Sequence, residues 1–255
     1  MNSPSPFVRR VADVPGYSPA NHTGTVNRRV IGKETVGARR LEVLLGTISR
    51  GHGALPHAHP NLEQASYLLS GTGVGEMAGQ RRTFEAGQWS FNPAGVFHRF
   101  EVVSDDPVQV MVVYAPPYSE NPNAAVVAAG VDDPRLHSDT GNVRDVPAHT
   151  KAIDFPHYWG AHVQPIITPQ TVDARFLGIY AIALEADGGA AAHGLSATEQ
   201  VLFIRTGAIE GLIEGQPFSA HAHDWVFVPD GAELQFKTSD MPSELFLIRA
   251  HEAQG

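Results

Sequence analysis

The chain has 255 residues, of which 42% are hydrophobic, so it can bury one large core or two small ones, as ordinary soluble globular proteins do. Its formal net charge is −9 and its pI is near 5.8, whereas nucleic-acid-binding proteins usually carry a net positive patch. No nucleic-acid partner is therefore expected. The absence of cysteine excludes a disulfide framework, a thiolate nucleophile and a cysteine-ligated metal.

Residues 1–12 are predicted to be an N-terminal arm. The start of the chain lacks the basic region and apolar core of a signal peptide, and nowhere do about 18 uncharged apolar residues follow one another. We therefore expect a cytoplasmic protein without a membrane partner.

Residues 13–115 form the first predicted domain. Short runs of β-branched and aromatic residues, separated by Gly, Pro and Asp turns, predict strands at 41–49, 64–69, 89–92, 98–103 and 108–114. No segment shows the apolar period of a long helix. The pattern favours an all-β barrel or jelly roll, whose closed sheet leaves an interior that can hold a ligand.

Three histidines of this domain are candidate metal ligands. His57 and His59 are two residues apart in an expected strand, and because side chains alternate along a strand they point to the same face. His98 follows a turn that contains Pro93 and Gly95 and begins the next strand. Imidazoles suit divalent transition metals, so the three together predict a metal site.

Residues 116–148 are rich in Pro, Asn and Asp and lack the alternation of a strand, so we expect a connector with one short helical turn. Residues 149–255 then repeat the first domain at a constant offset of 136 positions. The offset pairs His57 with His193, Gln64 with Gln200, Gly71 with Gly207, and Pro93 with Pro229. This predicts a tandem duplication of one module.

The second copy departs from the first at the candidate ligands. Leu195 stands at the position of His59 and Leu234 at that of His98, so only His193 and Gln200 remain. Leucine cannot coordinate a metal, and we expect the second copy to be metal-free and to bury surface against the first.

His221 and His223 resemble a second His-x-His pair. By the offset they match Glu85 and Gly87, which lie at a turn, so we interpret them as residues of a solvated turn.

The residues from Gly51 to His98 resemble the two motifs of the cupin superfamily in order and spacing. The first motif is matched by Gly51, His57, His59, Gln64 and Gly71, and the second by Gly87, Pro93, Gly95 and His98. The resemblance implies a bicupin, with two tandem jelly-roll β-barrels and one divalent metal ion in the N-terminal barrel. It also implies the ligand set His57, His59, Gln64 and His98, with Gln64 where the family usually has Glu.

The fourth ligand has alternatives. Gln64 keeps the six-residue gap to Gly71, whereas Glu63 fits the shorter spacing of the motif but is turned to the other face by strand alternation. A site of three histidines alone is the third possibility. Ser66 shares a face with Gln64, and Phe100 shares one with His98, so both are candidate substrate contacts, although core packing is the favoured role of Phe100 because Phe236 repeats it.

The resemblance and the neutral ligand set favour a metal-dependent enzyme that acts on a small oxygenated molecule, most of all a dioxygenase with Fe(II); Mn, Ni, Co, Cu and Zn are other candidate ions. A redox-neutral hydrolase, isomerase or lyase is the second hypothesis, and a non-catalytic cupin that binds a small molecule is the third. The expected partner is a small-molecule substrate, and the protein is expected to be a monomer of two fused barrels or a homo-oligomer.

Overall fold

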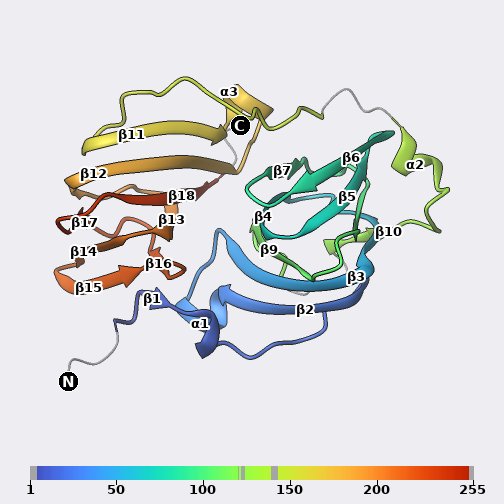
Figure 1. The fold of residues 1–255 in the computed structure, drawn as a ribbon, viewed down its shortest axis with the longest axis horizontal. Coiled ribbons are helices and arrows are strands. Elements are labelled where there is room, and N and C mark those ends of the chain that lie inside the picture. The colour runs from blue at the N-terminus through green and yellow to red at the C-terminus, as the bar shows by residue number, and fades with distance from the viewer. Residues whose placement is uncertain (1–4, 120, 122–123, 139–142, 253–255) are drawn as a thin grey trace.

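The computed structural model describes residues 5–119, 121, 124–138 and 143–252. Its described strands form two antiparallel sheets of nine strands, and each sheet curls into a nearly closed barrel. The first barrel runs from blue to green in Figure 1, and the second from yellow to red. The prediction of an all-β protein with two tandem barrels is therefore confirmed. Among the described residues, no helix is long and apolar enough to cross a membrane.

The first barrel begins with the hairpin of two long strands and ends with a strand that returns beside them. Its strands are β2 (His22–Ile31), β3 (Glu42–Ala58), β4 (Glu63–Ser70), β5 (Thr72–Met77), β6 (Gln80–Glu85), β7 (Trp89–Asn92), β8 (His98–Val102) and β9 (Val108–Ala115), with the short helix α1 (Lys33–Val36) between β2 and β3. The strand order is β6-β5-β8-β3-β9-β4-β7, with β2 and β10 also paired to β3. β6 and β7 thus end the sheet.

The second barrel repeats this arrangement. Its strands are β11 (Tyr158–Ile167), β12 (Leu177–His193), β13 (Thr198–Thr206), β14 (Ala208–Ile213), β15 (Gln216–His221), β16 (Trp225–Val228), β17 (Leu234–Thr238) and β18 (Ser243–His251), with α3 (Pro169–Val172) in the place of α1. The bulges also repeat, because Gly24 in β2 and Gly160 in β11 have φ values of +50° and +53° and lie where each register shifts. The predicted duplication is therefore visible in the backbone.

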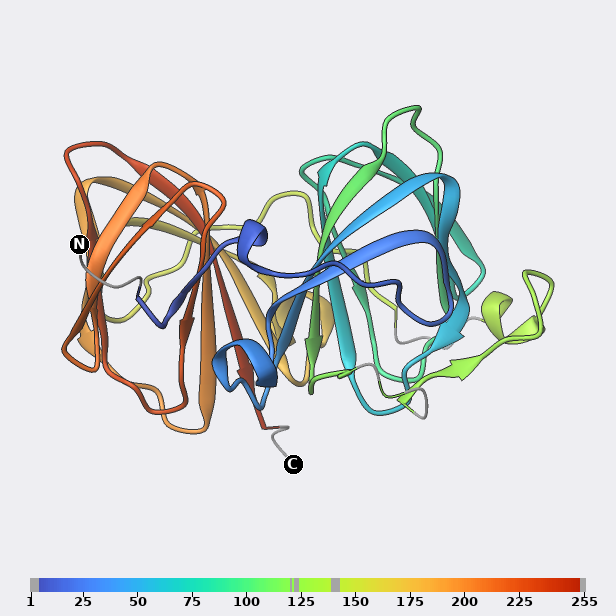
Figure 2. The same ribbon diagram turned by 90° about the horizontal axis from the view of Figure 1, so that it is seen from below.

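The arm and the connector each add a short strand to a barrel. β1 (Val8–Arg9) pairs with β16 of the second barrel and is followed by the 3₁₀ turn η1 (Val11–Asp13), so the start of the chain crosses from one barrel to the other (Figure 2). β10 (Val126–Val127) pairs with the end of β3, and α2 (Pro134–His137) is the helical turn expected in the connector.

The two barrels share one apolar core. Tyr67 and Trp89 of the first barrel pack edge-on against Phe246 of the second, with ring centroids 4.7 and 5.1 Å apart, and Phe203 joins the same cluster. Each sheet therefore buries one face against its copy, which is the packing expected of the duplicated module.

Candidate metal centre

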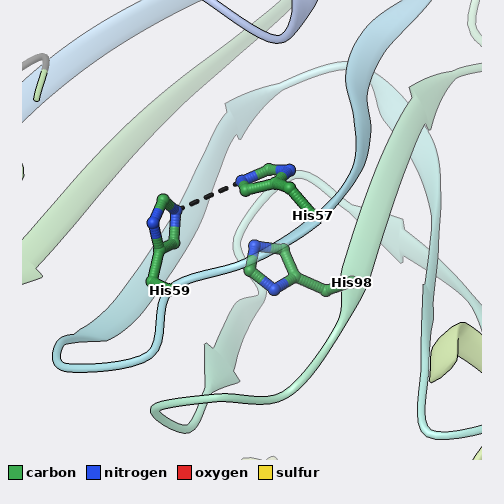
Figure 3. Close-up of side chains that lie close together, drawn as sticks. All are labelled: His57, His59 and His98. Atoms are coloured by element: carbon green, nitrogen blue, oxygen red, sulfur yellow. Dashed lines mark hydrogen bonds between the residues drawn. The ribbon is translucent and has the colours of Figure 1, made fainter. Parts of the chain in front are cut away.

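His57, His59 and His98 come together inside the first barrel. His57 lies on β3, and His59 is the first residue after that strand ends. His98 is the first residue of β8, and it pairs with His57 between the two strands. One nitrogen from each ring lies within 4.8 Å of the other two, and the Nε2 atoms of His57 and His59 are 3.2 Å apart (Figure 3). None of the three is more than 5% exposed. His57 and His59 meet as predicted although His59 lies one residue past the end of β3, and the pairing of β3 with β8 brings His98 beside them.

The backbone determines which nitrogen of each ring is free. The Nδ1 atoms of His57, His98 and His59 lie 2.6, 3.0 and 3.1 Å from the carbonyl oxygens of Leu55, Val96 and Ala124. A carbonyl oxygen can only accept, so each Nδ1 carries the hydrogen and each Nε2 presents a lone pair. Lone pairs that face one another at 3.2 Å repel, and a shared cation turns this repulsion into attraction. The donor set therefore fits a metal ion.

Burial keeps the triad neutral. Desolvation, followed by the proximity of His59, lowers the pKa of His57 to about 3, and desolvation also lowers the pKa of His59 and takes that of His98 well below its ordinary value. A metal ion needs the unprotonated ring, so protons compete little with a metal at neutral pH.

Gln64 lies beside the triad with its oxygen toward it. Its Oε1 is 3.1 Å from His98 Nε2, and its side-chain amide donates to Ser66 Oγ at 3.3 Å. The lone pairs of Gln64 Oε1 face the lone pair of His98 Nε2. This contact is therefore repulsive without a shared cation, as is the contact between the Nε2 atoms of His57 and His59. The arrangement fits the expected fourth ligand, which stays a prediction.

The carboxylate of Glu63 lies away from the triad. It accepts the backbone N–H groups of Arg175, Phe176 and Leu177 at 2.6 to 3.2 Å, and all three belong to the second barrel or the turn before it. Glu199, its counterpart at the offset of 136, accepts the backbone N–H groups of Arg39 and Arg40. The sequence repeat already indicated that Glu63 has a structural role. Its counterpart Glu199 is present in the second copy, which lacks two of the three histidines and so has no need of a metal ligand there.

A cavity of about 530 Å³ adjoins the centre, and Gln64, Ser66, His98 and Phe100 are among the residues that line it. Phe100 also packs in the barrel core, where a Cβ added to Gly73 would come within 2.0 Å of its ring. Ser66 and Phe100 are therefore placed where substrate contacts were expected, and the contact itself stays a prediction. For Phe100 the favoured packing role is present as well.

Three further side chains at the centre were not predicted. The ring of His22 lies 5.9 Å from that of His57, while those of Tyr114 and Tyr118 lie 5.5 and 5.0 Å from that of His59. The offset pairs His22 with Tyr158, whose ring likewise lies 5.9 Å from that of His193, but because the two residue types differ the repeat carried no signal for His22. Tyr118 belongs to the connector, which has no counterpart in the repeat.

The second barrel contains an arginine where the first has its candidate metal centre. Gln200 Oε1 accepts from Arg249 Nε at 3.0 Å, and the guanidinium lies over the ring of Phe155 at 4.7 Å. Arg249 on β18 is the strand partner of Gln200 on β13. In the first barrel the strand partner of Gln64 is Tyr114 on β9. A cation of the chain itself thus occupies this position. Among the described residues, only the triad of the first barrel groups three histidines or carboxylates close enough for one ion.

His221 and His223 lie at the turn that the repeat predicted. His221 ends β15, and His223 has a φ of +72°, as Gly87 has a φ of +91° in the first barrel. Both histidines are exposed, and neither belongs to the triad.

Comparison with known proteins agrees with this architecture. Residues 44–114 match the cupin domain family, whereas no curated protein matches the sequence. Oxalate decarboxylase from Lactobacillus farciminis, in complex with formate, aligns with a TM-score of 0.70 and 15% identity over 100% of this chain and 88% of that one. A variant of oxalate decarboxylase from Bacillus subtilis aligns with a TM-score of 0.69 and 13% identity over 100% and 79% of the two chains. Identities this low show a shared fold alone, so the chain has the two-barrel bicupin fold of these proteins, a cupin domain at residues 44–114, and a candidate metal site in its N-terminal barrel.

Proposed function

We propose that this bicupin is an enzyme that binds a small oxygenated organic molecule at one divalent metal ion held by His57, His59 and His98, with Gln64 as the fourth ligand. The observation that carries the proposal is the convergence of unprotonated Nε2 atoms beside a cavity. When bound, such an ion would act as a Lewis acid toward a substrate oxygen and, as Fe(II), would also supply a site for dioxygen.

The wall of the cavity supports a substrate with little charge of its own. Each of the four arginines that line the cavity is paired with a carboxylate, as Arg82 with Asp145, Arg99 with Glu76, Arg144 with Asp173, and Arg205 with Glu244. Near the triad the lining is neutral, with Ser66 and Asn92 as hydrogen-bonding groups. An enol or a phenol, whose oxygen a metal can bind, matches such a wall better than a dicarboxylate does.

The neutral ligand set supports a dioxygenase as the first choice of reaction, because three imidazoles and an amide leave the full charge on the ion. A redox-neutral reaction is the second candidate. It is favoured by the fold shared with proteins named oxalate decarboxylases, although the identity of 13 to 15% limits that argument to the fold.

The test is elemental analysis of the purified protein together with His98→Ala and, as a matched control, His193→Ala from the second barrel. We expect about one equivalent of metal, lost in His98→Ala and kept in His193→Ala, because only the first histidine belongs to the triad. Oxygen uptake with an enol or a phenol then separates the two reactions. Metal retained by His98→Ala, or absent from the native protein, would contradict the proposal.

A further inference from the structure

The triad is covered at one end of its barrel. His59 Nδ1 bonds to the carbonyl of Ala124, the ring of Tyr118 packs on His59, and β10 pairs with the end of β3. All of these covering groups come from the connector. This cover lies on His59 and on the end of β3, and the three histidines are at most 5% exposed, so a ligand has little access from that end.

The barrel wall is open at its side. β6 and β7 are the two ends of the first sheet, and neither pairs with a further strand among the described residues. Arg82 of β6 and Ser90 of β7 both line the cavity, and Ser90 stands opposite Ser66, on the face that carries Gln64. The cavity thus reaches the candidate metal centre between these two strand edges.

Beyond this gap, the cavity is bounded by parts of the chain outside the first barrel. Arg205 and Phe246 of the second barrel line it, and residues 143–148 of the connector cover it. Ion pairs hold that cover at two points, since Asp145 pairs with Arg82 and Arg144 pairs with Asp173 at 2.7 Å.

The second barrel shows the same gap in a closed form. There β1 pairs with β16, the counterpart of β7, and also lies next to β15, the counterpart of β6. Phe7 and Val8 pack against the core of that barrel. The chain therefore closes the gap with a paired strand in the barrel that has an arginine at its centre, whereas among the described residues no strand pairs with β6 or β7 at the gap of the barrel that has the triad.

We infer that ligands reach the metal through the gap between β6 and β7, and that Phe246, Arg205 and residues 143–148 form the outer half of the binding site. This inference rests on the proposed function and extends it to the class of substrate. The substrate is an elongated molecule whose oxygen meets the metal and whose apolar or aromatic part lies near Trp89 and Phe246, which line the outer cavity.

The test compares two tryptophan substitutions, Ser90→Trp in the gap and Val127→Trp on β10 at the covered end, where Val127 is 48% exposed. The probe is 4-nitrocatechol, and its rate of association with the Co(II)-loaded protein is followed by stopped-flow absorbance. We expect Ser90→Trp to slow association by about tenfold or more and Val127→Trp to leave it within about twofold. The reverse pattern, equal effects, or no effect of Ser90→Trp would overturn the inference.

A reversible block keeps the inference testable if Ser90→Trp fails to fold. Because the chain has no cysteine, Arg82→Cys combined with Asp145→Cys can tether the cover to β6 through a bismaleimide whose spacer replaces the length of the arginine side chain and contains a reducible disulfide. The cross-linked protein should bind 4-nitrocatechol more slowly than the same protein after reduction, and equal rates would overturn the inference. Failure of the native chain to take up metal, measured first, would instead refute the proposed function.

Discussion

Each triad histidine has one nitrogen bonded to the backbone and one that points at its neighbours. The carbonyls of Leu55, Val96 and Ala124 determine the tautomer, and burial makes the protonated ring unfavourable. The burial that keeps the rings unprotonated also makes the metal-free protein sensitive to acid, and the backbone hydrogen bonds partly oppose this because each raises the pKa of its ring.

We expect the stability of the metal-free protein to fall as the pH drops below about 6.5. The folded pKa of His57 is about 3 and lies below its unfolded value, so its contribution is complete above that unfolded value and is lost as the pH falls. At pH 5.5 the loss from His57 is about 1.4 kcal/mol, because the unfolded ring is then mostly protonated and the folded ring is not. Urea unfolding between pH 7.5 and 5.5 measures it.

The control for this prediction is His57→Asn, which removes one titrating ring. Its stability should depend less on pH than that of the native chain, and the difference isolates His57 from Glu63, whose pKa burial raises and whose effect has the opposite sign. Identical pH profiles for the two proteins would contradict the prediction.

Gln64→Glu tests whether position 64 supplies the fourth ligand. A carboxylate at this position would face the ion with a negative charge, and we expect metal to bind about tenfold more tightly, or about 1.4 kcal/mol. Gln64→Leu should weaken binding instead. Competition with a chromogenic chelator measures both affinities, and no change in either variant would favour a site of three histidines alone.

The triad could be predicted from the sequence because it depends on strand alternation and motif spacing, which are local features. The cover over His59 could not, since Ala124 and Tyr118 belong to a connector without a repeated pattern. The role of Arg249 could not be predicted from the offset of 136 either. The offset matches Tyr114, the strand partner of Gln64, to Ala250, but the strand partner of Gln200 is Arg249, one position earlier. Both the cover over His59 and the position of Arg249 depend on packing between segments that are distant in the sequence.

At the scale of elements, the repeat produces a reciprocal contact between the barrels. Glu63 begins β4 and accepts backbone N–H groups from the segment before β12, while Glu199 on β13 accepts those of the segment before β3. Each barrel thus inserts one buried carboxylate into the other, as two subunits do across a two-fold axis.

We expect Glu63→Gln and Glu199→Gln each to lower the free energy of unfolding by about 1.5–3 kcal/mol, the usual worth of hydrogen bonds to a charged group. An amide presents only one acceptor oxygen, and its NH₂ group would face backbone donors. Glu210→Gln, at a 63% exposed side chain, is the control and should change stability by less than about 0.5 kcal/mol. Loss of metal in Glu63→Gln, without loss of stability, would instead assign Glu63 to the metal site.

At the scale of the whole molecule, the two barrels are joined by a core to which both contribute. Met111 and Val113 of the first barrel belong to the same buried cluster as Phe203 and Ile248 of the second. Separating the barrels would expose this cluster to water, so we infer that they unfold together. Occupation of the metal centre in one barrel should then protect the other.

Metal at about 100 times its dissociation constant should therefore raise the free energy of opening by about 2.7 kcal/mol for the slowest-exchanging amides of both barrels. Hydrogen exchange measures this in β4 of the first barrel and in β14 of the second, whose Ile209 lies in a core cluster without residues of the first barrel. His98→Ala is the control, since added metal should leave both strands unchanged. Protection that rises in β4 alone would show that the barrels open independently, and the shared core would then be too weak to couple them.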